Sequence, residues 1–147
     1  MKNIYTWAAK PAKRTLTVGD LKAAKGKRKF TQVTANSVEE ADAAENAGFD
    51  GVWLSSFEMH AWNRLPDASI LNVADYADAV SKMADRIDVP ILVDADEGGP
   101  SSINTIRMAR EYSKAGAWGM CIEDNPSPKR CSFYGMKKEL EKPEIMT

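Results

Sequence analysis

Acidic residues end two apolar segments of the chain and could bind a metal ion together. Asp94 and Asp96 follow the apolar part of segment 90–94, and Glu123 follows segment 118–122. If both segments are strands, Asp94 and Asp96 point the same way, because they are two residues apart. Glu123 would lie on a neighbouring strand about 4.8 Å away. Because oxygen-only ligands suit Mg²⁺ or Mn²⁺, the spacing predicts a divalent-cation site.

Two other segments carry groups that could contact a substrate. Ser55, Ser56 and Phe57 end another apolar segment, and their hydroxyls and backbone amides could hold a carboxylate. Asp67 follows a proline and could act as a nucleophile or as an orienting carboxylate. Each candidate has a plainer interpretation: a polar turn with a helix start for the serines, and a Pro-Asp turn for Asp67. Asp96 could likewise be a loop acid before a helix.

The segment 125–132 is interrupted by prolines and leaves the end of a strand, as lids that exclude water often do. Within it, Lys129 and Arg130 precede Cys131, and two cations favour thiolate character. The other cysteine, Cys121, lies in an apolar segment and is predicted to belong to the core. The single histidine, His60, is interpreted as structural, so a Ser-His or Cys-His relay has little support.

Short apolar segments alternate with amphipathic helices along the chain. Strands are predicted at about 30–34, 51–55, 90–94 and 118–122, the third of them apolar enough to be buried on both faces. A capping box at Ser37 and Glu40 begins one helix, which Gly48 ends. A second helix should run from Asn72 to about Arg86, and a third from Ser101 or Ser102 to about residue 116.

Four strand–helix units in series predict an α/β fold with parallel strands and right-handed crossovers. Both a doubly wound sheet and a TIM-type (β/α)₈ barrel fit this pattern. A complete barrel needs about 250 residues and eight strands, so the chain would supply about four strands, or the first half. Such a half-barrel, over residues 30–147, has two open edges that must find partners.

The first 29 residues form a basic arm. They hold nine Lys or Arg and one acid, Asp20, although the net charge of the 147-residue chain is −1. The arm lacks a recognisable nucleic-acid module, so nucleic-acid binding is not expected. No apolar run approaches the length of a membrane span, and no secretion signal is evident. With only two cysteines, these features predict a cytoplasmic protein with free thiols.

Three patches of the sequence resemble the phosphoenolpyruvate mutase/isocitrate lyase superfamily: 47–55, 89–96 and 121–124. The resemblance spans about residues 30–145. It implies a barrel that binds Mg²⁺ (Mn²⁺ is possible) near Asp94, Asp96 and Glu123. A small 2-oxo acid or enol phosphate would lie against the Ser55–Phe57 turn, close to Trp53 and Asp94. Asp67 matches the carboxylate that these enzymes place near the transferring group.

The resemblance leaves two activities open. Segments 56–59 and 65–71 are most similar to the branch of phosphoenolpyruvate mutase and phosphonopyruvate hydrolase, which implies P–C bond formation or cleavage through a metal-held pyruvate enolate. The segment Lys129–Cys131 instead resembles the lid of isocitrate and methylisocitrate lyases, where the cysteine is the general acid. Lys129 and Cys131 are therefore catalytic candidates beside Asp67. Segment 16–21 is similar to ketopantoate hydroxymethyltransferase.

A third interpretation is a catalytically silent half-barrel. Relatives carry a second half with basic residues for the substrate, so the chain is expected to need a second chain or a second copy to complete the barrel.

Overall fold

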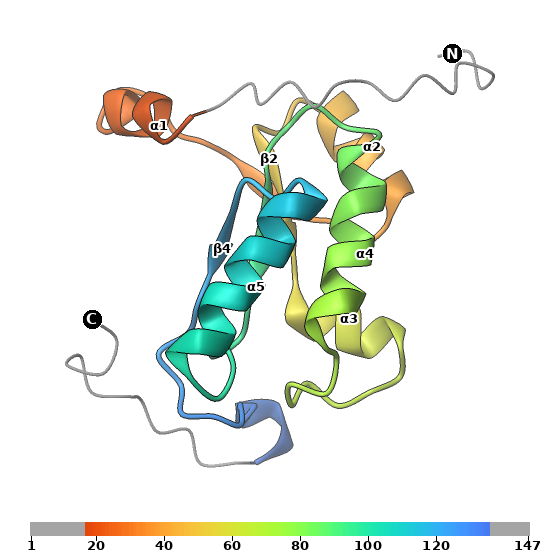
Figure 1. Ribbon diagram of the computed structural model, residues 1–147. Coiled ribbons are helices and arrows are strands. Elements are labelled where there is room, and N and C mark those ends of the chain that lie inside the picture. Colours follow the sequence, from red (N-terminus) through yellow and green to blue (C-terminus); the bar gives the residue numbers. More distant parts are fainter. Residues whose placement is uncertain (1–16, 136–147) are drawn as a thin grey trace.

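The computed structural model describes residues 17–135, in which four strands form one parallel sheet. The strands lie side by side in chain order: β1 (Gln32–Thr34), β2 (Gly51–Leu54), β3 (Ile91–Asp94) and β4 (Gly119–Cys121) (Figure 1). The helices between and around them are α1 (Val18–Ala24), α2 (Val38–Asn46), α3 (Ser56–Trp62), α4 (Val73–Ala84) and α5 (Ser102–Ala115), followed by a 3₁₀ turn at Ser132–Tyr134. All four predicted strands are confirmed.

The predicted helices begin and end at the residues whose side chains can cap them. Ser37 accepts a hydrogen bond from the Glu40 amide while the Glu40 side chain reaches back, as a capping box requires. Asn72 caps α4 in the same way. Gly48 and Gly116 follow α2 and α5 with φ of +88° and +105°, where a side chain would be strained. Local sequence thus determines these boundaries.

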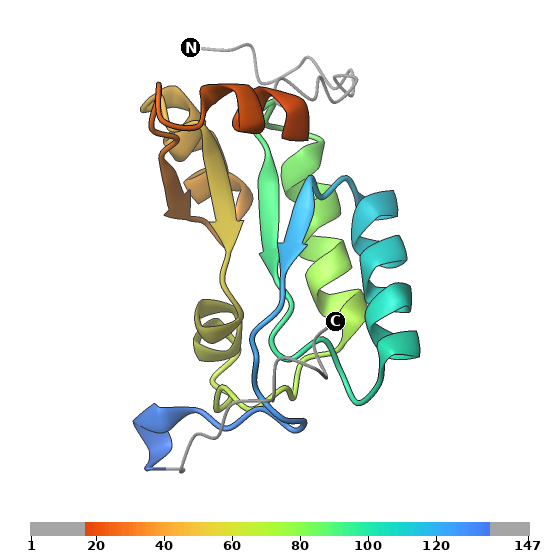
Figure 2. The same ribbon diagram turned by 90° about the vertical axis from the view of Figure 1, so that its left-hand side faces the viewer.

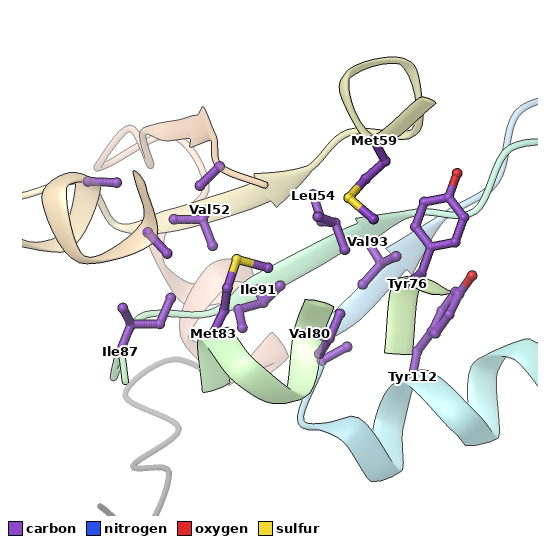
Figure 3. Close-up of a cluster of buried hydrophobic side chains, with 14 of the residues drawn as sticks. Val52, Leu54, Met59, Tyr76, Val80, Met83, Ile87, Ile91, Val93 and Tyr112 are labelled. Carbon is purple, nitrogen blue, oxygen red and sulfur yellow. The ribbon is translucent and has the colours of Figure 1, made fainter. Parts of the chain in front are cut away.

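One face of the sheet is covered by helices. Figure 2 shows α4 and α5 along one side of the strands, and α2 contacts both β2 and α4. The side chains of the strands that face these helices form the core together with apolar residues of α4 and α5, and Figure 3 shows the largest of them: Val52, Leu54, Ile91, Val93, Tyr76, Val80, Met83 and Tyr112. Their burial supplies the hydrophobic stabilisation of the layer.

The other face of the sheet has no helix over it in residues 17–135. Thr34, Trp53 and Leu92 lie in register across it, and Leu92 is only half-buried. The prediction that the third strand is buried on both faces is therefore wrong for this face. The prediction that Cys121 belongs to the core is wrong too. Cys121 is exposed, because alternation along β4 turns Met120 toward the core and Cys121 to the open face.

Most of the predicted basic arm, residues 1–16, lies outside the described residues. The described part of the arm contains α1, whose capping box is formed by Thr17 and Asp20. Over residues 17–135, none of the helices combines the length and the apolar character that crossing a membrane would take.

Candidate active site

Buried polar side chains gather beyond the carboxyl ends of the strands. Figure 2 shows α3 and the turn at 132–134 beyond the arrowheads of the strands. The polar and charged residues that are buried come from the loops and helix starts at this end: Ser55, Ser56, His60, Asp67, Asp94, Asp96, Asn125 and Lys129. In parallel α/β folds this is the end at which catalytic residues collect.

Asp94 is held by the neutral donors of two neighbouring segments. Its Oδ2 atom accepts from the Ser56 amide at 3.3 Å and from the Ser56 hydroxyl at 3.0 Å. Its Oδ1 atom accepts from the Asp96 amide at 3.2 Å. Asp96 has a φ of +50°, a left-handed conformation that costs a non-glycine residue free energy and that clusters at functional sites. Asp96 thus lies in a turn after β3 and not in the extended conformation assumed from the sequence, and its amide holds the Asp94 carboxylate.

The ammonium group of Lys129 lies inside this cluster. Its Nζ atom donates to Asp96 Oδ1 at 2.5 Å, to Asp67 Oδ1 at 3.0 Å and to Ser56 Oγ at 3.0 Å. Glu123 Oε1 is 3.8 Å away, at ion-pair distance. An ammonium group has three hydrogens to donate, and these three hydrogen bonds use them. Lys129, which is only 7% exposed, is therefore the positive centre of the site.

The charges in this cluster shift each other's protonation. Burial opposes the charge of Lys129, but the hydrogen bonds and charges of Asp96 and then Asp67 outweigh it, and the pKa of Lys129 is raised. Burial also raises the pKa of Asp96, against the lowering effects of the hydrogen bonds from Lys129 and Ser56 and of the Lys129 charge. Lys129 is thus a permanent cation at neutral pH, and Asp96 carries its negative charge at a cost.

Glu123 is brought to Asp96 by backbone pairing that continues past the strands. The Glu123 amide donates to the Asp96 carbonyl at 2.7 Å, and the Ala95 amide donates to the Cys121 carbonyl at 2.9 Å. The Asn125 side-chain amide donates to Glu123 Oε2. The expectation that acids at two consecutive strand ends lie together therefore holds for Asp96 and Glu123, which both approach Lys129.

His60 positions the loop that carries Asp67. It is fully buried in α3, and its Nε2 atom lies 3.1 Å and 3.2 Å from the amides of Ile70 and Leu71, which donate to it. Because Nε2 accepts, the ring proton is on Nδ1, which donates to the Ser56 carbonyl at 2.8 Å. His60 therefore ties α3 to the loop after it, in keeping with its interpretation as structural.

Ser55, Ser56 and Phe57 form the start of α3 directly after β2. Ser55 caps the helix through a bond from the Glu58 amide, and its own amide donates to Asn36 Oδ1 at 3.2 Å. The Ser56 amide is used by Asp94. A substrate carboxylate at this turn would therefore compete with existing bonds for two of the three amides. Trp53 lies half-buried on the helix-free face of β2, two residues before Ser55.

Cys131 lies at the end of the predicted lid. It is 8% exposed and precedes the 3₁₀ turn, where the Phe133 ring lies 5.6 Å from the Phe57 ring. The lid is further joined to its neighbours through Glu97, which accepts from Ser127 at 3.2 Å and from Ser69 at 2.8 Å. The loop therefore closes over the site, and a role for Cys131 as an acid stays a prediction.

The carboxylates offer the right atoms for Mg²⁺ but are arranged around the lysine. Asp94, Asp96 and Glu123 are an oxygen-only donor set of the kind Mg²⁺ prefers. Among residues 17–135, however, no three His, Cys, Asp or Glu side chains are placed so that they could hold a metal ion as they stand. The donor chemistry fits a divalent cation, and ligation by these three residues stays a prediction.

A cavity of about 360 Å³ reaches the cluster from the side of α4 and α5. Asp94, Asp96 and Glu97 line it together with Tyr76 and Tyr112. Burial, and then the charge of Asp96, raises the pKa of both tyrosines, so their hydroxyls stay protonated. The cavity gives small polar species a path to the two aspartates.

The chain is similar to known proteins over most of its length. Residues 24–144 match the family model described as phosphoenolpyruvate phosphomutase. The chain belongs to the phosphoenolpyruvate mutase family. It is 34% identical over 106 residues to phosphonopyruvate hydrolase from Variovorax sp. (strain Pal2), covering 72% of this chain and 37% of that protein. It is 35% identical over 103 residues to 2-methylisocitrate lyase from Aeropyrum pernix, covering 70% and 33%.

Solved structures of the family share its fold. Phosphoenolpyruvate phosphomutase from Streptomyces platensis subsp. rosaceus superimposes with a TM-score of 0.76 at 34% identity, over 85% of this chain and 44% of that one. Phosphonopyruvate hydrolase in complex with oxalate and Mg²⁺ gives 0.74 at 32%, over 86% and 43%. The chain thus spans roughly two fifths of its relatives' length. Its four parallel strands are part of the family's TIM-type barrel, which confirms the predicted fold class.

Three contributors to the site were not predicted from sequence. The sequence pattern identifies His60 only as structural, without its partners, and Asn125 only as the first residue of the predicted lid, and it does not single out Glu97. A histidine four residues after Ser56 on α3 is the one local signal that was available, because i and i+4 share a helix face. Asn125 and Glu97 acquire their roles from the paths of three loops, which short-range pattern does not specify.

Proposed function

We propose that this chain forms part of a magnesium-dependent enzyme of the phosphoenolpyruvate mutase type, which makes or breaks P–C bonds in phosphoenolpyruvate or phosphonopyruvate. The similarity to phosphonopyruvate hydrolase and to phosphoenolpyruvate phosphomutase supports this branch of the family. The observation that carries the proposal is the buried cluster in which Lys129 touches both Asp67 and Asp96 beside Ser56. A site of this kind presents fixed charges to a small, highly charged substrate.

The chain's own residues would act by holding charge in place. Lys129 and Asp67 form an ion pair at 3.0 Å, so an arriving phosphoryl group could take the ammonium as its counter-charge while Asp67 orients it. The Ser56 hydroxyl, already bonded to both Lys129 and Asp94, could turn to a substrate oxygen. Asp94, Asp96 and Glu123 would hold Mg²⁺, which supplies positive charge for a 2-oxo acid or its enolate. Positioning and charge stabilisation would then carry the reaction.

The test is to incubate the assembled protein, purified with the chain or copy that completes the barrel, with phosphonopyruvate and Mg²⁺ and to follow the ³¹P signals. Conversion to phosphoenolpyruvate indicates a mutase, and release of inorganic phosphate indicates a hydrolase. Asp67→Asn, which keeps the side-chain volume but removes the charge, should lower the rate by about 100-fold or more. An unchanged ³¹P spectrum would count against P–C chemistry.

The second candidate is a C–C bond lyase or decarboxylase with Cys131 as general acid. It is favoured by the 35% identity to 2-methylisocitrate lyase and by Cys131 lying two residues from Lys129 in the same lid. Cleavage of 2-methylisocitrate would be measured with the wild-type protein and with Cys131→Ser. This substitution should abolish lyase activity and leave P–C chemistry much less affected, so it separates the two candidates.

We also propose that a second chain or a second copy completes the barrel. Within residues 17–135, β1 and β4 each pair with one strand only, and exposed strand edges tend to pair further. Trp53 and Leu92 on the helix-free face would then become the barrel interior. A native mass measurement should show an assembly, and a stable monomer without activity would instead favour a catalytically silent half-barrel.

A further inference from the structure

The carboxylate cluster is only partly neutralised by Lys129. Asp67, Asp94 and Asp96 are 4%, 9% and 6% exposed, and the Glu123 side chain is 31% exposed. Asp67, Asp96 and Glu123 lie within hydrogen-bond or ion-pair distance of one ammonium group, and Asp94 is hydrogen-bonded to Ser56, which also contacts that ammonium. Buried charges of one sign require compensation from the other. The three buried aspartates beside this single ammonium group therefore favour the binding of a further cation.

The Lys129 ammonium group forms hydrogen bonds with only some of the carboxylates in the cluster. Asp96 and Asp67 receive hydrogen bonds from it directly, whereas Asp94 is bound by the neutral donors of Ser56 and Asp96. The strongest contact, 2.5 Å, is to Asp96 Oδ1. Asp96 is also the middle member of the three acids that the proposed function assigns to the metal. Lysine and metal therefore require the same carboxylate.

Lys129 and Mg²⁺ cannot both bind the Asp96 carboxylate as strongly as either would bind it alone. A Mg²⁺ ion binds carboxylate oxygens at about 2.0–2.1 Å, so an ion on Asp96 would lie within a few ångströms of the Lys129 ammonium. The cluster is buried, where repulsion between cations is less screened than in water. Binding of the dication must then weaken the hold of Asp96 on Lys129.

We propose that Lys129 and a divalent cation are alternative occupants of this carboxylate cluster, so that binding of the cation expels the ammonium from Asp96 and releases the lid. This inference rests on the proposed metal site at Asp94, Asp96 and Glu123. Within the cluster the lid is anchored through Lys129, and outside it Ser127 donates a hydrogen bond to Glu97. Pro128 and Arg130, on either side of Lys129, are exposed. A lysine released toward the substrate side would be available to the phosphoryl group or distal carboxylate.

The first test compares Mg²⁺ affinity by titration calorimetry for the wild-type chain, Lys129→Met and Arg130→Met. Lys129→Met removes the competitor and should bind Mg²⁺ about tenfold more tightly or better, a difference of roughly 1.4 kcal/mol. Arg130→Met removes the same charge from an exposed neighbour and controls for the general electrostatic field. If Lys129→Met binds Mg²⁺ no more tightly than Arg130→Met does, Lys129 and Mg²⁺ do not compete for the cluster.

The second test needs only the wild-type protein, so it holds even if Lys129→Met folds poorly. Hydrogen exchange of the backbone amides in 125–131 should become faster when Mg²⁺ is added, because Lys129 no longer holds this segment to Asp96. Slower or unchanged exchange at saturating Mg²⁺ contradicts the release. If Mg²⁺ binds all variants equally, the proposed competition between Lys129 and Mg²⁺ is wrong and the metal site stands. If it binds none of them, the metal site of the proposed function fails as well.

Discussion

Acidic residues have different surroundings at the two ends of the sheet. At the carboxyl ends of the strands, Asp67, Asp94 and Asp96 are buried around Lys129. At the amino ends, Asp50 and Glu45 accept hydrogen bonds from backbone amides: Asp50 from Thr31 at 3.0 Å, and Glu45 from Asp88 and Val89 at 2.6 Å and 3.2 Å. Carboxylates are therefore buried together at the carboxyl ends of the strands, whereas at the amino ends they accept hydrogen bonds from the backbone amides of turns.

Backbone strain follows the same division. The residues other than glycine with positive φ within 17–135 are Arg64, Ser69 and Asp96, and all three lie beyond the carboxyl ends of the strands. The turns at the amino ends place glycine where φ is positive, at positions 48 and 116, which avoids the strain. Strain and buried charge both cost stability, and they persist where the surrounding structure holds them for function. The comparison therefore separates an end that carries strain and buried charge from an end that avoids both.

Removing the cation at each end should give the largest contrast. Without Mg²⁺, Lys129→Met leaves buried carboxylates uncompensated and should lower the free energy of unfolding by about 4 kcal/mol. Arg28→Met removes the exposed partner of Asp50 and should cost less than about 1 kcal/mol. Urea denaturation of both variants at neutral pH measures the difference. Equal losses would mean that the two ends are not distinct in this way.

The effect of Lys129 has a definite pH dependence. Its pKa is raised in the folded state, so its stabilisation is fully present below the unfolded pKa near 10.5 and is lost as the pH rises through the higher folded value. The difference in stability between wild type and Lys129→Met should therefore persist at neutral pH and shrink only in strong alkali. A difference that disappeared near pH 8 would exclude a cation held by Asp96 and Asp67.

Much of the fold was predictable because its determinants are local. The apolar segments that became β2 and β3, and the caps at Ser37 and Asn72, each act within a few residues. The predictions were wrong about which faces of individual strands are buried. Cys121 and Leu92 were assigned to buried positions because their segments are apolar, but one face of the sheet lacks helices in residues 17–135. A short apolar run does not reveal how many of its faces will be covered.

The site was predictable only in part. Acids at the ends of two strands indicated that Asp96 and Glu123 would meet, since neighbouring parallel strands end together. The position of Lys129 between Asp96 and Asp67 depends on the return of a loop more than thirty residues later in the chain than Asp96. The same limit applies to His60, whose acceptor atom meets amides ten and eleven residues away. Such contacts arise from loop paths, which residue spacing does not encode.

Breaking the His60 tie should be the next largest effect. His60→Ala opens a cavity in α3 and leaves the amides of Ile70 and Leu71 without their acceptor, at an expected loss of about 3 kcal/mol. Activity should fall as well, because the loop that carries Asp67 loses its anchor. His60→Gln can place an oxygen near the position of Nε2 and should recover part of both losses. A variant as stable as wild type would show that this tie is dispensable.

The amino end of the sheet can be tested through its glycines. A Cβ atom at Gly116 would lie 2.8 Å from the Ala84 Cβ atom, whereas a Cβ at Gly48 meets nothing within 4 Å. Both residues have positive φ, so Gly48→Ala measures backbone strain alone, about 1 kcal/mol. Gly116→Ala should cost about 2 kcal/mol because the clash between α5 and α4 is added. Thermal denaturation compares the two variants. Equal decreases in Tm would mean that α4 and α5 can move apart without loss of stability.

A small effect is expected at Asp50. The hydrogen bond from the Thr31 amide, and to a lesser extent the charge of Arg28, lower its pKa below the usual 3.8. Its stabilisation is therefore present above pH 3.8 and disappears as the pH falls through the lower folded value. Asp50→Asn should cost about 1 kcal/mol at neutral pH, and the difference from wild type should vanish in strong acid. Asp78→Asn, which breaks an exposed pair with Lys82, serves as the control and should change stability less. A loss at Asp50 as large as that at Lys129 would mean that both ends of the sheet bury charge alike.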